Sequence, residues 1–185
     1  MAEEKTQAVA TEGEKQTGIG SGTWPFPDPR ALESVMRHQH ERGQDLLLRF
    51  LSSIGREDFV TPLECLAGGS IRDRVVHMVD AESFWMSVLT NRVHQPLQPA
   101  DYADMDAILP AWRAATDLTL NFLHTVDIAW FVREGLFAHP HRPEPLKLVP
   151  SLVVLHVLTH AYHHKGQICV AARLLGYTPP DLDFI

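Results

Sequence analysis

The segment from Pro150 to Leu175 carries the clearest helix signals in the chain, and it constrains the fold that can form around it. Pro150 suits the first position of a helix, because the backbone N–H that proline lacks has no partner there. Gly176 is typical of the residue that ends a helix, and Pro179–Pro180 prevents continuation. The sequence therefore predicts one long helix here. Its apolar residues must be buried against other elements.

Two more helices are expected in the first half of the chain. Asp28 and Pro29 form a start signal, with the aspartate as N-cap and the proline at the first helical position. This helix is expected to run to a stop at Gly55. The second helix begins at Ser70, and Asp73 three residues later completes a capping box. The sequence from 71 to 90 then continues as an apolar-rich helix.

A third helix is expected within residues 105–126. Because proline fits comfortably only in the first turn of a helix, Pro110 moves the expected start to near Asp106 or later. The connection over residues 128–149 is long for linked helices, and its aromatic and β-branched residues allow a short pair of strands. These features predict an all-α chain: a four-helix bundle with a long connection between helices 3 and 4.

Composition limits the class of protein. Residues 1–23 are polar, small and glycine-rich, so we expect a mobile N-terminal tail before a single domain over residues 24–185. The formal net charge is −7 and no cluster of lysine and arginine stands out, so neither nucleic acid nor membrane is expected as a partner. No apolar run approaches the length of a transmembrane helix and the N-terminus lacks a signal-peptide h-region, so we expect neither feature. Cys65 and Cys169 form no CxxC pair, so we expect a cytoplasmic protein.

The last predicted helix holds four of the chain's eleven histidines. Residues four apart share one face of a helix, so His156, His160 and His164 form a stripe with His163 beside it. Two imidazoles spaced in this way can bind one metal ion, and zinc needs further ligands, here from a facing helix. His77, in largely apolar surroundings on the second predicted helix, can supply one. An acid–base site without metal and a polar seam in the core are the alternatives.

Two motifs resemble those of the DinB/YfiT-like family. HVLTHAYHHKGQICVAARLLGYTPPDLDFI, at 156–185, is similar to the family's C-terminal helix and tail. GGSIRDRVVHMVDAESFW, at 68–85, resembles its second helix. The resemblance covers about residues 30–185 in matching order and spacing. It implies a four-helix bundle, often a homodimer, with a divalent metal ion held by three histidines.

Carried over by position, the resemblance implies that His77, His160 and His164 are the metal ligands. His156 and His163 then support the ligands or pack against them, and we count both as candidate cofactor-binding residues. Imidazole ligands suit several transition metals, of which we expect zinc or nickel.

Two positions on the first predicted helix depart from the family pattern. Many relatives carry two asparagines four residues apart that face the metal pocket, and here these positions are His40 and Gln44. His40 is a candidate catalytic base or fourth ligand, and Gln44 a candidate cofactor contact. Asp80 is a candidate base or partner of a ligand histidine, with a salt-bridged surface carboxylate as the alternative. Lys165 replaces the family's usual arginine, which keeps the charge but loses the two-pronged guanidinium.

A divalent ion bound by three neutral imidazoles lowers the pKa of a bound thiol or water. The proteins that this sequence resembles include thiol-dependent transferases and isomerases. We therefore expect a metal-dependent enzyme that transfers a low-molecular-weight thiol, its co-substrate, to a small-molecule electrophile. A metal-dependent hydrolase is the first alternative. The second is a non-catalytic, metal-binding stress-response protein, which a fourth protein ligand closing the site would favour.

Overall fold

The computed structural model of the chain describes residues 28–39, 41 and 45–182. The predicted tail, residues 1–23, lies outside these residues, and so do two site candidates, His40 and Gln44. Over the described residues the chain is mostly helical with one short pair of strands, so it is an all-α protein. Within this part, no helix is both long and apolar enough to cross a membrane.

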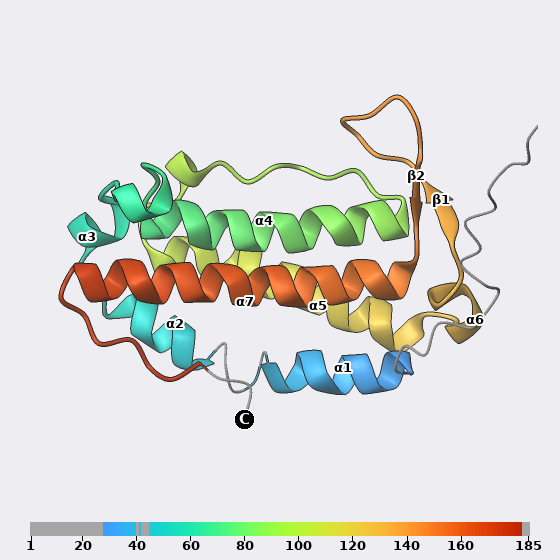
Figure 1. Cartoon of the computed structure of the whole chain (residues 1–185), viewed down its shortest axis with the longest axis horizontal. Helices are drawn as coiled ribbons and strands as arrows, with labels where there is room; N and C mark the ends of the chain where they lie inside the picture. The colour runs from blue at the N-terminus through green and yellow to red at the C-terminus, as the bar shows by residue number, and fades with distance from the viewer. Residues whose placement is uncertain (1–27, 40, 42–44, 183–185) are drawn as a thin grey trace, which may run out of the picture.

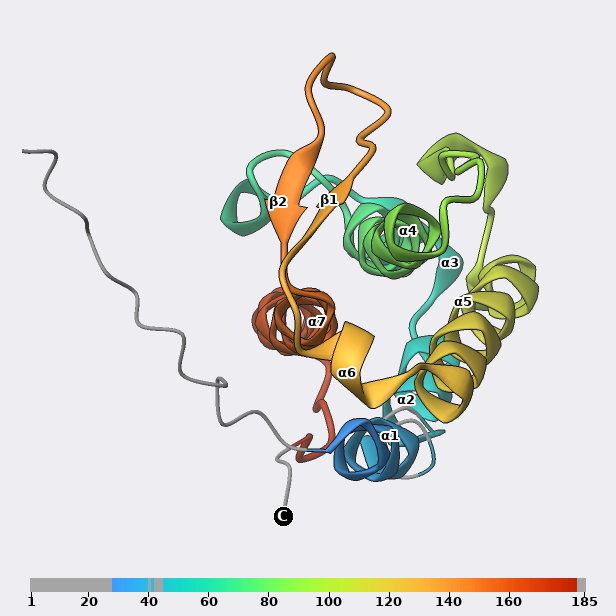
Figure 2. The ribbon, with the colours of Figure 1, turned by 90° about the vertical axis from the view of Figure 1, so that its right-hand side faces the viewer.

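Four helices extend along the long axis of the molecule (Figure 1). They are α1 (Pro29–His38), α4 (Ile71–Thr90), α5 (Met105–Thr125) and α7 (Pro150–Leu174). An end-on view places α4 between α5 and α7, with α1 beside α5 (Figure 2). All four predicted helical segments therefore contain a long helix, while their exact arrangement as a four-helix bundle stays a prediction.

Helix α4 begins as the sequence predicts. The Ser70 hydroxyl accepts a hydrogen bond from the backbone N–H of Asp73 at 3.2 Å, and an oxygen of the Asp73 carboxylate accepts one from the backbone N–H of Ser70 at 2.9 Å. This capping box satisfies two donors that the first turn leaves without helical partners. It fixes the start of the helix that carries His77.

Helix α7 also follows its prediction to within one residue. It begins at Pro150, and Gly176 beyond its end has φ of +88°, a conformation that favours glycine. The backbone N–H of Gly176 donates a hydrogen bond to the carbonyl of Arg173, and that of Tyr177 donates one to the carbonyl of Ala172, both at 3.0 Å. These bonds close the last turn of the helix.

The first predicted helix differs from the structure. Where one helix was expected up to Gly55, the described residues contain α1 and α2 (Asp45–Ser52), and residues 40 and 42–44 lie outside them. Helix α2 ends before Gly55, which precedes a short α3 (Arg56–Val60). The hydroxyl of Tyr177 links this corner to the end of α7: it donates to Asp58 at 2.7 Å and accepts from the Gly55 N–H at 3.0 Å. These hydrogen bonds join residues that are far apart in the chain, so the local sequence pattern does not predict them.

The third predicted helix begins within one residue of its expected start near Asp106, although Pro110 does not lie in its first turn. Helix α5 begins at Met105, and Pro110 falls in its second turn. The start is set by Asp104, whose carboxylate accepts a hydrogen bond from the Ala107 N–H at 3.1 Å, and by burial of Met105 and Ile108. Capping and packing here outweigh the cost of the hydrogen bond that Pro110 cannot donate.

The long connection between α5 and α7 contains α6 (Ile128–Phe131) and the expected strand pair. Strands β1 (Gly135–Phe137) and β2 (Leu146–Leu148) are antiparallel, with Gly135 opposite Leu148. The loop between them projects beyond α4 (Figure 1). We call residues 135–148 the hairpin.

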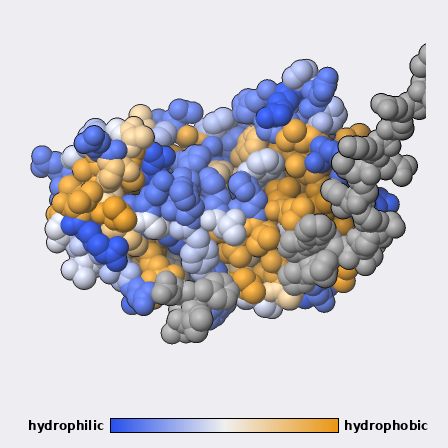
Figure 3. Space-filling model, in the orientation of Figure 1, coloured by the Kyte–Doolittle hydropathy of each residue, from blue (hydrophilic) through white to orange (hydrophobic). Residues whose placement is uncertain are grey.

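Two buried clusters support the helices from inside, and each includes residues of α4, α5 and α7. Two short 3₁₀ helices, η2 (Glu64–Leu66) and η3 (Pro99–Asp101), flank α4 in the chain. The face that carries α7 is hydrophilic over its middle and more hydrophobic toward both ends (Figure 3). The predicted histidine stripe belongs to this helix.

Candidate metal centre

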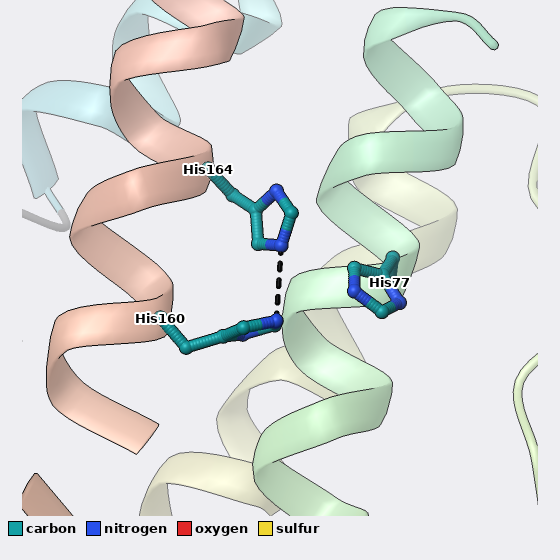
Figure 4. Close-up of side chains that lie close together, drawn as sticks. All are labelled: His77, His160 and His164. Atoms are coloured by element: carbon teal, nitrogen blue, oxygen red, sulfur yellow. Dashed lines mark hydrogen bonds between the residues drawn. The ribbon is translucent and has the colours of Figure 1, made fainter. Parts of the chain in front are cut away.

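Three histidines from two helices converge on one point. His160 and His164 extend from α7 toward His77 on α4 (Figure 4). Each offers a ring nitrogen, and these three atoms all lie within 4.8 Å of one another. The ring centroid of His77 lies 5.1 Å from that of His160 and 4.8 Å from that of His164. Over the described residues, this is the group of histidine, cysteine or carboxylate side chains with the spacing of a metal site.

Helix geometry places each of these side chains. The spacing of four between His160 and His164 puts them one turn apart on one face of α7, with their Nε2 atoms 3.0 Å apart. On α4, the neighbours Val76 and Met78 are buried while His77 itself is exposed. His164 is 5% exposed. The group is therefore anchored at His164 and open to solvent at His77.

The surroundings favour the neutral form of all three imidazoles. Burial, reinforced by the neighbouring histidines, lowers the pKa of His160 to about 4. Burial also lowers the pKa of His77, and the positive charge of Arg74 acts in the same direction. Burial lowers the pKa of His164, although its hydrogen bond with Gln167 acts in the opposite direction. Neutral imidazole is the form that binds metals, so the group is ready for a metal ion at neutral pH.

Gln167 orients His164, and the sequence analysis missed it. The Gln167 Oε1 atom lies 2.8 Å from His164 Nδ1. An amide oxygen can only accept, so Nδ1 carries the proton and Nε2 keeps its lone pair for a ligand bond. The signal was present in the sequence, because Gln167 follows His164 by three residues on the same helix.

The two flanking histidines lie beside the group. His163 is exposed, and its Nε2 lies 3.1 Å from the Gln167 amide nitrogen, so that Gln167 joins His163 to His164. His156 is exposed one turn before His160, with ring centroids 5.6 Å apart. Both rings lie next to a ligand candidate, and their supporting or contacting roles stay predictions.

Asp80 has contacts away from the three rings. Its Oδ1 atom accepts a hydrogen bond from the Leu97 N–H at 2.8 Å and lies 3.1 Å from His94 Nε2. These contacts hold the segment after α4 against the helix. The charge of Asp80 also acts on His77, whose pKa it raises against the effect of burial, so a role for Asp80 beside the site stays a prediction.

Helix α7 also carries a buried charged residue, Lys165. Lys165 is 7% exposed, with its Nζ 5.0 Å from the centroid of the Tyr162 ring. Burial lowers the pKa of Lys165, while the nearby charge of Glu82 acts in the opposite direction. Glu82 is also buried and accepts a hydrogen bond from the Thr119 hydroxyl at 2.7 Å. Lys165 therefore occupies an interior position, with Glu82 as the nearby opposite charge.

Sequence comparison agrees with the helices and the site. A model of the DinB family matches residues 32–185, which include all three histidines of the group. The chain belongs to the DinB family. No curated protein matches the chain. Family membership and the three-histidine group together fit a DinB-like, metal-binding protein.

Proposed function

We propose that this DinB-family chain is a metal-dependent enzyme that transfers a low-molecular-weight thiol to a small electrophile. His77, His160 and His164 hold the divalent ion, zinc or nickel, inside a four-helix bundle. The observation that carries the proposal is the convergence of three neutral imidazoles that stay open to solvent on one side. An open position is what separates a catalytic metal site from a closed structural one.

The donor set fits such an ion. Three imidazole nitrogens within 4.8 Å of one another can reach one ion at the usual zinc–nitrogen distance of about 2.0–2.1 Å after small side-chain rotations. The ion, when bound, lowers the pKa of a thiol or water that reaches it. Transfer forms a bond from sulfur to the electrophilic carbon, and the leaving group departs with the bonding electron pair. The thiol proton is released to solvent or to a base.

The chain's own residues bind and orient the reactants. Gln167 holds the His164 ring with Nε2 facing the other two histidines. His163, exposed beside His164, contacts the incoming thiol, and His156, exposed beside His160, packs against that ligand. Asp80, engaged by Leu97 and His94, holds the neighbouring segment in place. The His77 side is the approach for both reactants.

Replacing Gln167 with leucine is expected to weaken metal binding about 10–100-fold, the usual effect of losing the partner that orients a ligand histidine. Gln167→Glu keeps an oxygen acceptor for His164 Nδ1 and is expected to retain most of the affinity. Competition with a chromophoric chelator measures both. Gln98→Leu, at an exposed glutamine, is the control. Equal affinity in Gln167→Leu and wild type would contradict the orienting role.

Thiol consumption tests the proposed activity. Zinc- or nickel-loaded protein is incubated with glutathione, cysteine or coenzyme A and an α-halo carbonyl compound, and product is quantified by mass spectrometry. Turnover that needs both protein and thiol is expected. His77→Ala should abolish it without unfolding, because His77 is exposed and its loss leaves no buried cavity.

Two other outcomes would replace the proposal. Turnover of p-nitrophenyl acetate without thiol would identify a hydrolase. Stoichiometric metal with no turnover of either kind would identify a non-catalytic metal-binding protein.

A further inference from the structure

A row of aromatic and imidazole rings leads away from the three histidines. The His156 ring centroid lies 5.6 Å from that of His160, and the Trp85 centroid lies 5.7 Å from that of His156. Trp85 in turn lies 6.4 Å from His139, in the loop of the hairpin. The row thus joins α7, α4 and the hairpin, and it begins at the candidate metal centre.

Phe84 continues the row on α4. It is seven residues after His77, which places both on nearly the same face of the helix. The Phe84 ring meets His139 edge to face at 5.2 Å and His94 at 5.4 Å. His141 stacks on it, with 8° between the ring planes and 6.1 Å between the centroids. Three separate segments therefore direct rings to one place.

A cavity adjoins this end of the row. It measures about 270 Å³ and lies between the end of α4 and the hairpin. His94 and His139 line it, together with Val88, Arg92 and Ala138. Of the rings in the row, His139 lines it, so this space extends the row at the hairpin end.

The row offers accessible ring surface, and the cationic side chains Arg92 and Arg142 lie at its hairpin end. Phe84 and Trp85 are only partly buried, so ring surface remains accessible. The nearby carboxylate is Asp80, which Leu97 and His94 engage. Aromatic rings attract other rings edge to face or offset, beyond the effect of buried area.

We propose that the row formed by Phe84, Trp85, His139 and His156 is a subsite for a planar aromatic group on the electrophile. The reacting carbon then lies near His77, His160 and His164. This inference rests on the proposed function and names the substrate class that the site selects. Trp85 is the central residue, because it contacts both His156 and His139.

Binding of an unreactive probe tests the subsite without turnover. Metal-loaded protein, without thiol, is titrated with 4-fluoroacetophenone and followed by fluorine NMR. We expect saturable binding that Trp85→Ala weakens about tenfold, in line with the loss of ring stacking. Trp85→Phe should retain most of it. Trp130→Ala is the matched control, since Trp130 packs on Phe122 and Phe137 instead.

His139→Ala, on the hairpin, is a second variant in case Trp85→Ala does not fold, and it should also weaken binding severalfold. Unchanged binding in the folded variants would overturn the proposal. So would equal displacement of the probe by acetophenone and butanone, because butanone lacks the ring.

A rate comparison separates this inference from the proposed function. Phenacyl chloride and chloroacetone both react at a chloromethyl carbon next to a carbonyl group. They differ in the other substituent on the carbonyl, which is phenyl in the first and methyl in the second. The thiol sulfur bonds to that carbon, chloride leaves with the electron pair, and the thiol proton enters the buffer. We expect kcat/KM to favour phenacyl chloride beyond the uncatalysed ratio, and Trp85→Ala to remove this preference. Probe binding without turnover would keep the subsite and reject the transferase. Turnover without preference would reject the subsite.

Discussion

Replacing His164 with alanine is expected to remove the divalent metal, about one equivalent, that the wild-type protein binds. His164 is the most buried of the three histidines, and Gln167 fixes its ring. Losing a ligand costs more affinity than the roughly 10–100-fold lost with a supporting partner. Two histidines on different helices then remain, fewer ligands than metal sites in proteins use. Elemental analysis after dialysis of protein loaded with zinc or nickel measures the loss.

His124→Ala is the matched control for this experiment. The His124 side chain is 66% exposed on α5, with Glu33 as its ion-pair partner at 3.6 Å. This variant should keep its full equivalent of metal, and circular dichroism should show both variants folded. A wild-type protein that takes up neither zinc nor nickel would refute the ligand assignment. The three histidines would then form an acid–base site or a polar seam.

The local part of the site could be predicted from the sequence. Helix periodicity alone places His160 and His164 on one face, because residues four apart are neighbours. The start of α4 at Ser70 and the end of α7 before Gly176 also follow from capping rules that involve only adjacent residues. The meeting of His77 with the α7 pair depends on how α4 packs against α7. The sequence pattern offered that contact beside two alternatives, and the resemblance to the DinB family favoured it.

Contacts between distant segments explain what the sequence did not reveal. Pro110 lies inside α5 because Asp104 caps the helix and Met105 is buried, and both effects exceed the local preference of proline. The ring row depends on the hairpin, whose loop brings His139 to Phe84 across more than fifty residues. Single-helix patterns contain no information about such pairings, so the proposed substrate class could come only from the structure.

Replacing Trp112 with alanine is expected to destabilise the protein by about 3–5 kcal/mol, the usual range for truncating a buried tryptophan. Trp112 lies on α5, is 3% exposed and belongs to the same core cluster as Ile168 of α7. It already borders a pocket of about 30 Å³, so the missing indole enlarges an existing space. Urea denaturation measures the change, and the melting temperature should fall by roughly 10 °C.

Trp112→Ala and His164→Ala together separate the scaffold from the site. Trp112 is not one of the three converging histidines, so the folded Trp112→Ala variant should keep its metal while losing stability. His164→Ala should lose its metal. Without metal, its free energy of unfolding should differ from that of the metal-free wild type by no more than a few kcal/mol. Val93→Ala, at a side chain 90% exposed, should change stability by less than about 0.5 kcal/mol. If Trp112→Ala also lost its metal, binding would be coupled to the packing of the core, and the site would not be preformed on α4 and α7.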